Sequence, residues 1–295
     1  MDFSKLNGFI YFNKKFVNSK KANIHVLNHS LHFAPSVFEG IAVYEGKPFL
    51  SIDHFKRLNN SCRLLKLKFY KSFKDLNLIS EKLIKKNKIK NGYIRPIVFR
   101  SANSMSPDII NCRTEFAMAA WEWGKLFKKK SVSLDVSKWP KLSYKEFPIQ
   151  AKSSGSYQAS VISKAELSKH LFDDCVMLDL KKNVAETTAC NIFWIKNNTI
   201  YTPKTHSILN GITRQAVIKI AKKNKIKLQT GDFKLNKLLL ADTVFLTGTA
   251  AEIQLVGKIK GKKFNINNTI LNKIISDFQK NIKKQIMSLK KISKS

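Results

Sequence analysis

The sequence FPIQAKSSGSYQAS, residues 147–160, places a single lysine between a short apolar run and a loop of small residues. Lys152 follows Ile149 and Ala151, and serines surround Gly155 directly after it. Small residues let the backbone turn sharply and let a ligand approach closely. A lysine that loses water at a strand end has a lowered pKa and can attack a carbonyl group to form a Schiff base. A surface lysine ahead of a helix is the alternative that this stretch alone leaves open.

The residues after the loop predict a helix. Ser156 is a residue type that caps helix N-termini, and apolar residues recur after it at helical spacing. The apolar positions of this predicted helix are Tyr157, Val161, Ile162, Ala165 and Leu167.

Length and composition indicate a folded protein of two domains. The chain has 295 residues, 43% of them hydrophobic, which is ample for large cores. Its N-terminal residues begin with an acid and alternate apolar and polar side chains, as in a strand and not a signal peptide. No apolar run reaches 18 residues, so we expect no membrane span. Apolar periodicity stops after residue 123, which predicts a smaller domain at 1–124, a linker at 125–137 and a larger domain at 138–295.

The net charge of +34 raises the question of a polyanionic partner. The basic residues are 48 lysines and 6 arginines, whereas proteins that read phosphates and bases favour the planar fork of arginine. The lysines are spread over the whole chain between apolar residues. We therefore predict solvated faces that bind polyanions loosely and in a salt-sensitive way, with no specific nucleic-acid site. A basic nucleic-acid-binding protein is the more distant alternative.

The cysteines and histidines form no metal-binding pattern. Cys62, Cys112, Cys175 and Cys190 stand far apart, no CxxC pair exists, and the six histidines add no ligand spacing. We expect reduced thiols, a cytoplasmic location and no metal site.

The first half of the chain alternates predicted strands and helices. Residues 9–17 read as a hairpin that turns at Asn13-Lys14, and 37–44 reads as one continuous strand. Ser51 is placed to cap a helix that carries Arg57 near its start, and a second helix is predicted over 75–89.

Residues 92–100, GYIRPIVFR, predict another strand, with Pro96 inside it. Proline cannot donate to a strand ladder, so we expect an edge strand or a bulge there. Arg95 alternates with apolar neighbours and points to one face, where it either enters a site or faces water. A further strand is predicted over 116–123.

The second half predicts strands over 131–137, 174–180 and 184–196. Glu186 lies in the last of these, either facing water or entering a site as a carboxylate. Asn197-Asn198 predicts a hairpin tip at the end of that strand.

Two loops are suited to anions. Gly211 precedes an amphipathic helix that opens with Ile212 and Thr213, and helix N-termini offer free N–H groups and the positive end of the dipole. The predicted strand 242–247 runs into the small residues 248–251, whose N–H groups can also face an anion.

Eight landmarks stand in one order along nearly the whole chain. They are SVFEGI at 36–41, HFKRL at 54–58, YIRP at 93–96, AKSSGSY at 151–157, AET at 185–187, NIF at 191–193, NGITR at 210–214 and TGTAAEI at 247–253. In this order the chain resembles the branched-chain amino-acid aminotransferases, which are fold-type IV enzymes of pyridoxal 5'-phosphate (PLP). The resemblance implies an α/β fold with a smaller N-terminal α/β domain, a larger C-terminal α/β domain and the cofactor between them.

The resemblance also implies how the cofactor is held. Lys152 would carry PLP covalently and later move the proton. Glu186 would pair with the pyridine nitrogen and keep it protonated, which fits a fixed carboxylate beside a cation. Tyr157 would hydrogen-bond the phenolic oxygen of the ring. The implied phosphate contacts are Arg57, the loop at Gly211 with the N–H groups of Ile212 and Thr213, and the loop at Gly248 with Thr249.

On the substrate side, the resemblance implies that Tyr93 and the backbone of Thr249 and Ala250 meet the α-carboxylate. Phe38 and Trp123 would form the apolar wall for the side chain.

The implied reaction is a ping-pong transfer of the amino group from L-leucine, L-isoleucine or L-valine to 2-oxoglutarate. Arg95 would then meet the distal carboxylate of glutamate. The family implies a homodimer or a higher homo-oligomer. A D-amino-acid aminotransferase or an aminodeoxychorismate lyase of the same fold type is the nearer alternative, and YIRP and VFEGI argue against both.

The chain departs from the family pattern mainly on the substrate side. Phe33 and Leu126 stand near positions where tyrosines are usual, and Ala42 replaces a usual arginine after VFEGI. These changes make substrate preference less secure than cofactor use. The serines after Lys152 replace other small residues and asparagine, which is a tolerable change.

Overall fold

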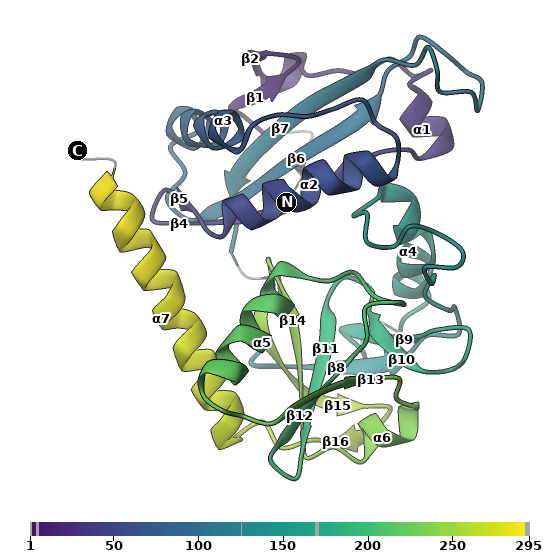
Figure 1. The fold of residues 1–295 in the computed structure, drawn as a ribbon, viewed down its shortest axis with the longest axis vertical. Helices are drawn as coiled ribbons and strands as arrows, with labels where there is room; N and C mark the ends of the chain where they lie inside the picture. The colour runs from purple at the N-terminus through teal and green to yellow at the C-terminus, as the bar shows by residue number, and fades with distance from the viewer. Residues whose placement is uncertain (1, 4–5, 125, 169–170, 293–295) are drawn as a thin grey trace. The chain divides into compact units, whose positions relative to one another are not determined.

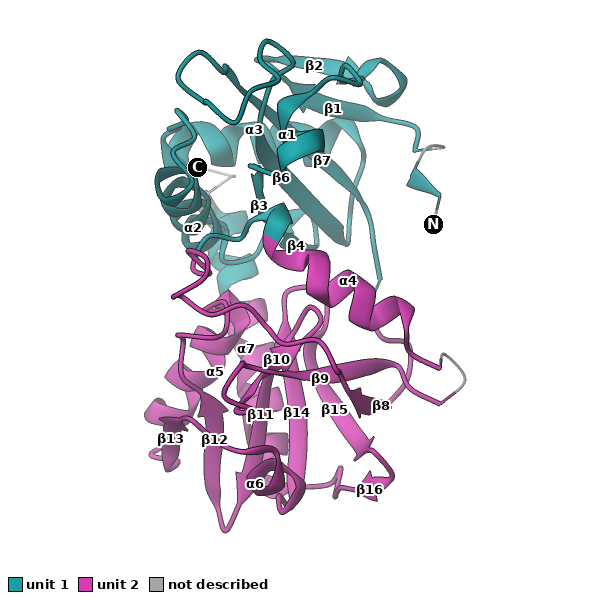
Figure 2. Cartoon of the chain, turned by 90° about the vertical axis from the view of Figure 1, so that its right-hand side faces the viewer, with its two compact units in different colours: residues 1–124, 151–155, 284–295 teal, residues 125–150, 156–283 magenta. Residues whose placement is uncertain are grey.

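A computed structural model gives the fold and describes residues 2–3, 6–124, 126–168 and 171–292. The chain divides into two compact units, shown in Figure 2. The first holds residues 1–124, 151–155 and 284–295, and the second holds 125–150 and 156–283. The sequence pattern instead assigns all of 138–295 to the second domain. Segment 151–155 belongs with the first unit because Ser153 forms an antiparallel bridge with Val37.

The first unit is built on an antiparallel sheet with the strand order β2-β1-β7-β6-β4-β5, and β3 also pairs with β6 (Figure 1). Helices α2 and α3 pack together over this sheet and share one hydrophobic core with it. The strands are β1 (Phe9–Phe12), β2 (Lys15–Asn18), β3 (Val37–Phe38), β4 (Ile41–Tyr44), β5 (Lys47–Pro48), β6 (Gly92–Arg100) and β7 (Thr114–Glu122). The helices are α1 (His29–Phe33), α2 (Ser51–Leu64) and α3 (Phe73–Lys86).

Local sequence explains the first hairpin but not the start of α2. Asn13 and Lys14 both adopt positive φ, so the predicted β1–β2 turn is confirmed. The prediction that Ser51 caps α2 is wrong. Ser51 is the first helical residue, and Leu50 takes the N-cap position in the left-handed region without a side-chain hydrogen bond. Tertiary packing of the buried helix face therefore outweighs the missing cap.

The prediction of one strand over 37–44 is wrong, because β3 and β4 are separated at Glu39-Gly40. The same break explains Pro96, which lies in a central strand and not at the predicted edge or bulge. The carbonyl of Pro96 accepts from the Glu39 amide at 2.9 Å, so its missing N–H faces the gap between β3 and β4. Pro96 therefore removes no hydrogen bond between neighbouring strands.

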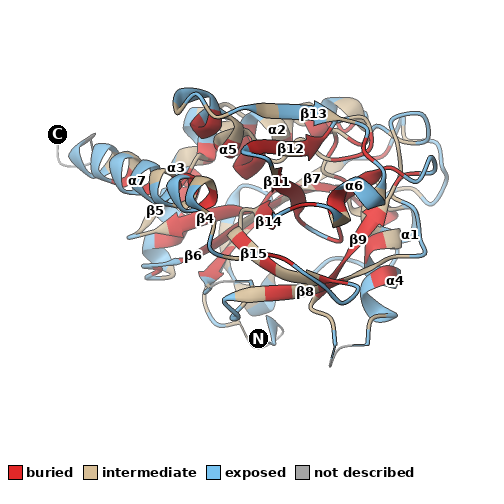
Figure 3. Cartoon of the chain, turned by 90° about the horizontal axis from the view of Figure 1, so that it is seen from below, coloured by how far each residue is buried: buried red, intermediate tan, exposed pale blue. Residues whose placement is uncertain are grey.

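The second unit is built on a sheet with the order β10-β9-β8-β15-β14-β11-β12-β13; in addition, β16 pairs with β15, and β10 also pairs with β11. Buried strand residues form its core, as Figure 3 shows. The strands are β8 (Ser131–Val136), β9 (Asp174–Leu178), β10 (Val184–Thr187), β11 (Asn191–Lys196), β12 (Thr199–Pro203), β13 (Leu228–Gly231), β14 (Thr243–Gly248), β15 (Glu252–Ile259) and β16 (Lys262–Lys263). The helices are α4 (Gln158–Ala165), α5 (Ile212–Lys223) and α6 (Leu235–Leu239), and α7 (Thr269–Ile292) begins in this unit.

The predicted strand over 184–196 is two strands, β10 and β11, which fold back on each other with Glu186 opposite Asn191. Thr187 closes the turn by exchanging hydrogen bonds with Cys190. The predicted tip at Asn197-Asn198 is confirmed, since both residues adopt positive φ between β11 and β12.

The predicted helix after Lys152 forms, but the prediction that Ser156 caps it is wrong. A short 3₁₀ turn, Ser154–Tyr157, precedes α4, and Tyr157 takes the N-cap position without a side-chain bond. The buried residues of α4 are Ser160 and Ser163, whereas Val161 is 64% exposed. No helix among the described residues is long and apolar enough to cross a membrane.

Candidate active site

Lys152 is fixed in the first unit through its backbone. Its carbonyl accepts from the Phe38 amide at 3.0 Å, and its own amide donates to Ser61 Oγ at 3.1 Å. Its ammonium Nζ lies 4.8 Å from the centroid of the Phe38 ring. The lysine predicted from the sequence is therefore held against β3 and α2.

The surroundings of Lys152 favour its uncharged form. Burial, reinforced by the cation of Arg57, lowers its pKa to about 8, although the carboxylate of Glu39 opposes the shift. The lowered pKa increases the fraction of the amine that is unprotonated near neutral pH. Such an amine can act as a nucleophile and as a base.

Glu39, at the break between β3 and β4, is the centre of a charged cluster that the sequence analysis missed. Arg57 donates to both of its oxygens, from Nε to Oε1 at 2.6 Å and from Nη2 to Oε2 at 2.9 Å. His54 Nδ1 lies 2.7 Å from Oε2. Burial raises the pKa of Glu39, but Arg57 and His54 outweigh burial and hold it well below its usual range. Burial lowers the pKa of His54, so a neutral ring donates to this carboxylate.

Predicted substrate residues of β6 meet an aromatic wall in the first unit. Tyr93 lies 5.4 Å from Trp123, between ring centroids, and the guanidinium of Arg95 lies 4.7 Å from the Phe38 ring. Arg95 Nε is buried and has no hydrogen-bond partner among the described residues. Gly40 is required here, because a Cβ at this position would lie 1.6 Å from the Tyr93 hydroxyl oxygen.

Glu186 lies in the second unit, where two residues that the sequence analysis passed over contact it. Lys141 Nζ lies 3.1 Å from Oε1 of Glu186, and both side chains are largely buried. The Nδ2 amide of Asn191 donates to Oε2 at 2.8 Å. The strand register places Asn191 opposite Glu186 of β10 on one side and opposite Thr247 of β14 on the other.

Tyr157, at the end of the 3₁₀ turn, lies near the same lysine. Lys141 Nζ is 5.6 Å from the Tyr157 ring centroid and 3.1 Å from Ser160 Oγ. Burial would lower the pKa of Lys141, but the carboxylate of Glu186 and the phenol of Tyr157 outweigh it, so the pKa is raised.

Gly211 is the N-cap of α5, and no side-chain hydrogen bond caps the helix. Ile212 and Thr213 are its first residues, so their N–H groups belong to the end that attracts anions. A Cβ at Gly211 would lie 2.1 Å from Asn191 Oδ1, so the glycine lets this strand and helix approach.

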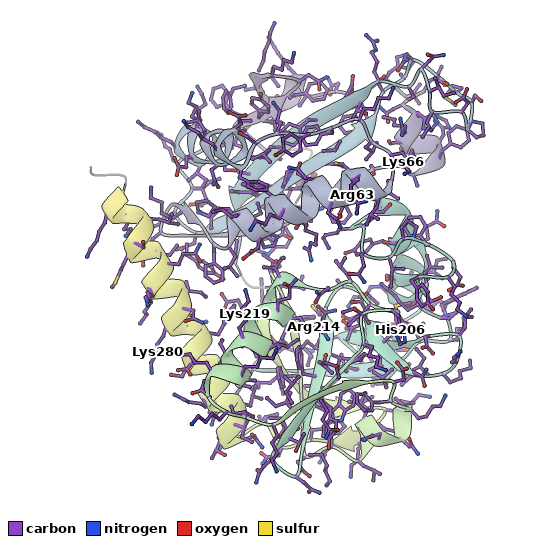
Figure 4. The ribbon with its side chains drawn as sticks, viewed as in Figure 1. Arg63, Lys66, His206, Arg214, Lys219 and Lys280 are labelled. Carbon is purple, nitrogen blue, oxygen red and sulfur yellow. The ribbon has the colours of Figure 1, made fainter. Side chains whose placement is uncertain are left out.

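Arg214, labelled in Figure 4, follows on α5 and is buried in the second unit. It donates to the Pro203 carbonyl at 2.9 Å, and burial lowers its pKa to about 10 although Glu186 opposes the shift.

Gly248 ends β14, and Thr249 and Ala250 form the loop that leads to β15. The Ala250 carbonyl accepts from the Leu126 amide at 3.0 Å. Thr247 Oγ1 is buried beside this loop without a hydrogen-bond partner among the described residues.

The predicted site residues thus form two groups. Those in the first unit are Phe38, Arg57, Tyr93, Arg95, Trp123 and Lys152. Those in the second unit are Tyr157, Glu186, Gly211, Ile212, Thr213, Gly248, Thr249 and Ala250. Among the departures from the family pattern, Phe33 and Leu126 are exposed and Ala42 is buried on β4.

Comparisons with known proteins place these groups in context. A model of the family described as amino-transferase class IV matches residues 36–259. The chain is 37% identical to the "Probable branched-chain-amino-acid aminotransferase" of Rickettsia felis, over 85% of this chain and 86% of the relative.

Two solved structures are similar. The branched-chain aminotransferase of Thermoproteus uzoniensis with norvaline matches with a TM-score of 0.88 and 28% identity, over 93% of this chain and 94% of that one. The branched-chain amino acid aminotransferase of T.th., complexed with N-(5'-phosphopyridoxyl)-L-glutamate, matches with a TM-score of 0.86 and 32% identity, over 92% of both chains. They confirm the predicted α/β fold of the fold-type IV enzymes.

Proposed function

Because this chain belongs to the amino-transferase class IV family, we propose that it is a branched-chain amino-acid aminotransferase. It transfers the amino group of L-leucine, L-isoleucine or L-valine to 2-oxoglutarate, giving a branched-chain 2-oxo acid and L-glutamate. The names of its relatives and of the similar structures support this reaction. The cofactor is PLP, which enzymes of this family use.

The observation that carries the proposal is the environment of Lys152. A buried lysine with a pKa of about 8 suits both the covalent capture of an aldehyde and a later proton transfer. When bound, PLP supplies an electron-accepting ring that stabilises negative charge at the substrate α-carbon. Lys152 would take the proton from that carbon and return it to the other end of the reacting system.

The remaining groups would bind and orient the ring. Glu186 would accept the pyridine N–H and keep the nitrogen charged, and Tyr157 would hydrogen-bond the phenolic oxygen. Both residues are in the second unit, and the two protein donors on Glu186 leave acceptor capacity on its carboxylate.

The phosphate would be held without a metal ion. Arg57 supplies a cation, and the N-terminus of α5 supplies the amides of Ile212 and Thr213 beside Gly211. The amide and hydroxyl of Thr249 after Gly248 would complete the contacts. The uncapped end of α5 and the glycine at its start support this assignment.

The substrate would meet an apolar wall and two anion contacts. Phe38 and Trp123 suit branched aliphatic side chains, and Tyr93 with the backbone of Thr249 and Ala250 would bind the α-carboxylate. Arg95 would meet the distal carboxylate of glutamate, which is costly to bury without a cation. The buried Nε of Arg95, which has no partner among the described residues, supports that role.

We also propose that the enzyme is a homodimer or a larger homo-oligomer and works in the cytoplasm, binding small amino acids and oxo acids without a specific nucleic-acid or membrane partner.

An absorbance spectrum of the protein with PLP tests the cofactor link. A band that borohydride abolishes, with pyridoxyl then found on Lys152, is expected. Lys152→Ala should bind PLP weakly through the phosphate contacts and lose measurable turnover, whereas Lys145→Ala, at an exposed lysine, should keep it. Pyridoxyl on another lysine would overturn the site. Single-turnover reactions with leucine, D-alanine and aminodeoxychorismate separate the proposed activity from the alternatives of the same fold type.

A further inference from the structure

Lys141 is a largely buried charged residue to which the proposed function gives no role. It lies on the loop between β8 and α4, and its amide donates to the Leu178 carbonyl at the end of β9 at 2.8 Å. Its side chain is 11% exposed. Placing an ammonium there is costly unless it is paired and hydrogen-bonded.

The ammonium of Lys141 contacts groups from three parts of the second unit. It pairs with Oε1 of Glu186 on β10 at 3.1 Å and donates to Ser160 Oγ on α4 at 3.1 Å. It also faces the ring of Tyr157 at 5.6 Å. One cation therefore lies beside both residues to which we assign the ring nitrogen and the phenolic oxygen.

We propose that Lys141 is a positioning residue that sets the charge state of the cofactor ring through Glu186 and Tyr157. The inference rests on the proposed function, because those two residues contact the ring only there. A buried carboxylate without a counter-charge takes up a proton. Lys141 supplies that counter-charge to Glu186 at 3.1 Å and would share the carboxylate with the ring nitrogen once the ring is bound.

The other charged groups near this cluster do not replace Lys141. Asp174 on β9 raises the pKa of Lys141 and is itself held by Lys164 at 3.6 Å. Arg214 on α5 lies near Glu186, but its hydrogen bonds go to Asn210, Thr202 and Pro203. Lys141 is the cation that forms an ion pair with Glu186 within the part of the chain that the structure describes.

The sign of the expected effect follows from charge alone. A cation disfavours every protonation close to it, so its removal raises the pKa at which bound PLP changes its absorbance. Lys141→Met should raise this spectral pKa by about one pH unit, which corresponds to about 1.4 kcal/mol of electrostatic interaction. Lys141→Arg keeps the charge and should leave the spectral pKa close to that of the parent.

The matched control is Lys138→Met. Lys138 is a nearby lysine on the same loop, but it is exposed and pairs with the exposed Glu166 at 2.9 Å. Solvent screens that pair, so its removal should leave the spectral pKa unchanged.

The experiment is a spectral pH titration of the whole chain reconstituted with PLP, for the parent, Lys141→Met, Lys141→Arg and Lys138→Met. Lys141→Gln, neutral but still polar, carries the test if the methionine variant does not fold. A rise in the spectral pKa of the neutral Lys141 variants, without a rise in Lys141→Arg or Lys138→Met, supports the inference. An unchanged spectral pKa in a neutral Lys141 variant that binds PLP overturns it, as does an equal rise with Lys138→Met. If the parent itself does not bind PLP covalently, the proposed function fails instead.

Discussion

Glu39 and Glu186 are both buried carboxylates, one in each unit, and their partners differ. Glu39 accepts from Arg57 Nε, Arg57 Nη2, His54 Nδ1 and the Gly40 amide. Glu186 accepts from Lys141 and from Asn191 among the described residues. An ionised carboxylate has about four lone-pair sites, so Glu39 is filled by the protein and Glu186 is not.

The difference separates a carboxylate that holds the structure from one that is available to a ligand. A filled acceptor shell fixes the donors around it, here Arg57 and His54 on α2. A half-filled shell in a buried place can accept one more donor, which suits the role that we propose for Glu186. The comparison therefore predicts that Glu39 governs stability and that Glu186 governs catalysis.

Glu39→Gln should give the largest change in stability. It leaves the Arg57 guanidinium without its counter-charge in a buried place, and breaking such a pair costs about 3–5 kcal/mol. The free energy of unfolding of the apoprotein, measured in urea, reports the loss. Glu45→Gln is the control, because Glu45 is an exposed carboxylate paired with Lys290 and should contribute under about 0.5 kcal/mol. A loss at Glu39 no larger than at Glu45 would remove the contrast.

Glu186→Gln should slow turnover by about 10²-fold, or about 3 kcal/mol, the scale of one preorganised electrostatic contact, and should still bind PLP. Its effect on unfolding should be smaller than that of Glu39→Gln, because Glu186 has fewer protein donors than Glu39 and the carbonyl oxygen of Gln can still accept from one of the two. Steady-state rates with saturating leucine and 2-oxoglutarate check this. Activity within threefold of the parent would mean that another group serves the ring nitrogen.

Arg57 and Arg95, both in the first unit, differ in the same way as Glu39 and Glu186. Arg57 is held by Glu39, whereas Arg95 stacks on Phe38 and its Nε has no partner among the described residues. Arg95→Met should therefore lower kcat/KM for glutamate by about 10²-fold and affect the half-reaction with leucine far less.

Single-turnover half-reactions, followed through the PLP spectrum, measure both substrates for Arg95→Met. Arg63→Met is the control, since Arg63 on α2 is exposed and donates to Asn60 at 3.0 Å (Figure 4). Equal losses for leucine and glutamate would leave Arg95 as a structural or α-carboxylate residue.

Some candidate site residues could be predicted from the sequence because their neighbours along the chain distinguish them from other residues of the same type. Lys152 stood in a loop of small residues, and Gly211 opened an amphipathic helix, so both could be found without a structure. Lys141 could not, because in a chain with 48 lysines nothing local distinguishes it. Glu39 and His54 were missed because their pairing depends on the break between β3 and β4, which only tertiary packing reveals.

The predicted caps failed for a related reason. Ser51 and Ser156 have the residue type of an N-cap, but the helices begin where packing places them. The strand and helix pattern was predictable because the hydrophobic periodicity is local, whereas helix starts and charge pairs depend on distant parts of the chain.

The smallest expected effect is a pH dependence of stability from the filled cluster. The pKa of His54 is lowered by burial, so below its ordinary value near 6.5 the unfolded chain binds a proton that the folded chain does not. The pKa of Glu39 is also lowered, so its contribution is present above its ordinary value of 4.5 and is lost as the pH falls below it. Both signs predict that acidification destabilises the apoprotein, first through His54 and then through Glu39. Each proton difference contributes at most about 1.4 kcal/mol per pH unit.

His54→Asn isolates the first of these steps. Asparagine can place an amide donor near the position of Nδ1, so it keeps the bond to Glu39 but cannot titrate. The decline in the free energy of unfolding that begins near pH 6.5 should then disappear, while the steeper decline below pH 4.5 should remain. His206→Gln is the matched control, because His206 pairs with Asp232 at 2.8 Å in a partly exposed place and should leave the first step intact. If His54→Asn keeps the full decline between these two values, the acid sensitivity comes from groups outside the Glu39 cluster, and the filled carboxylate shell does not control the pH range in which the first unit is stable.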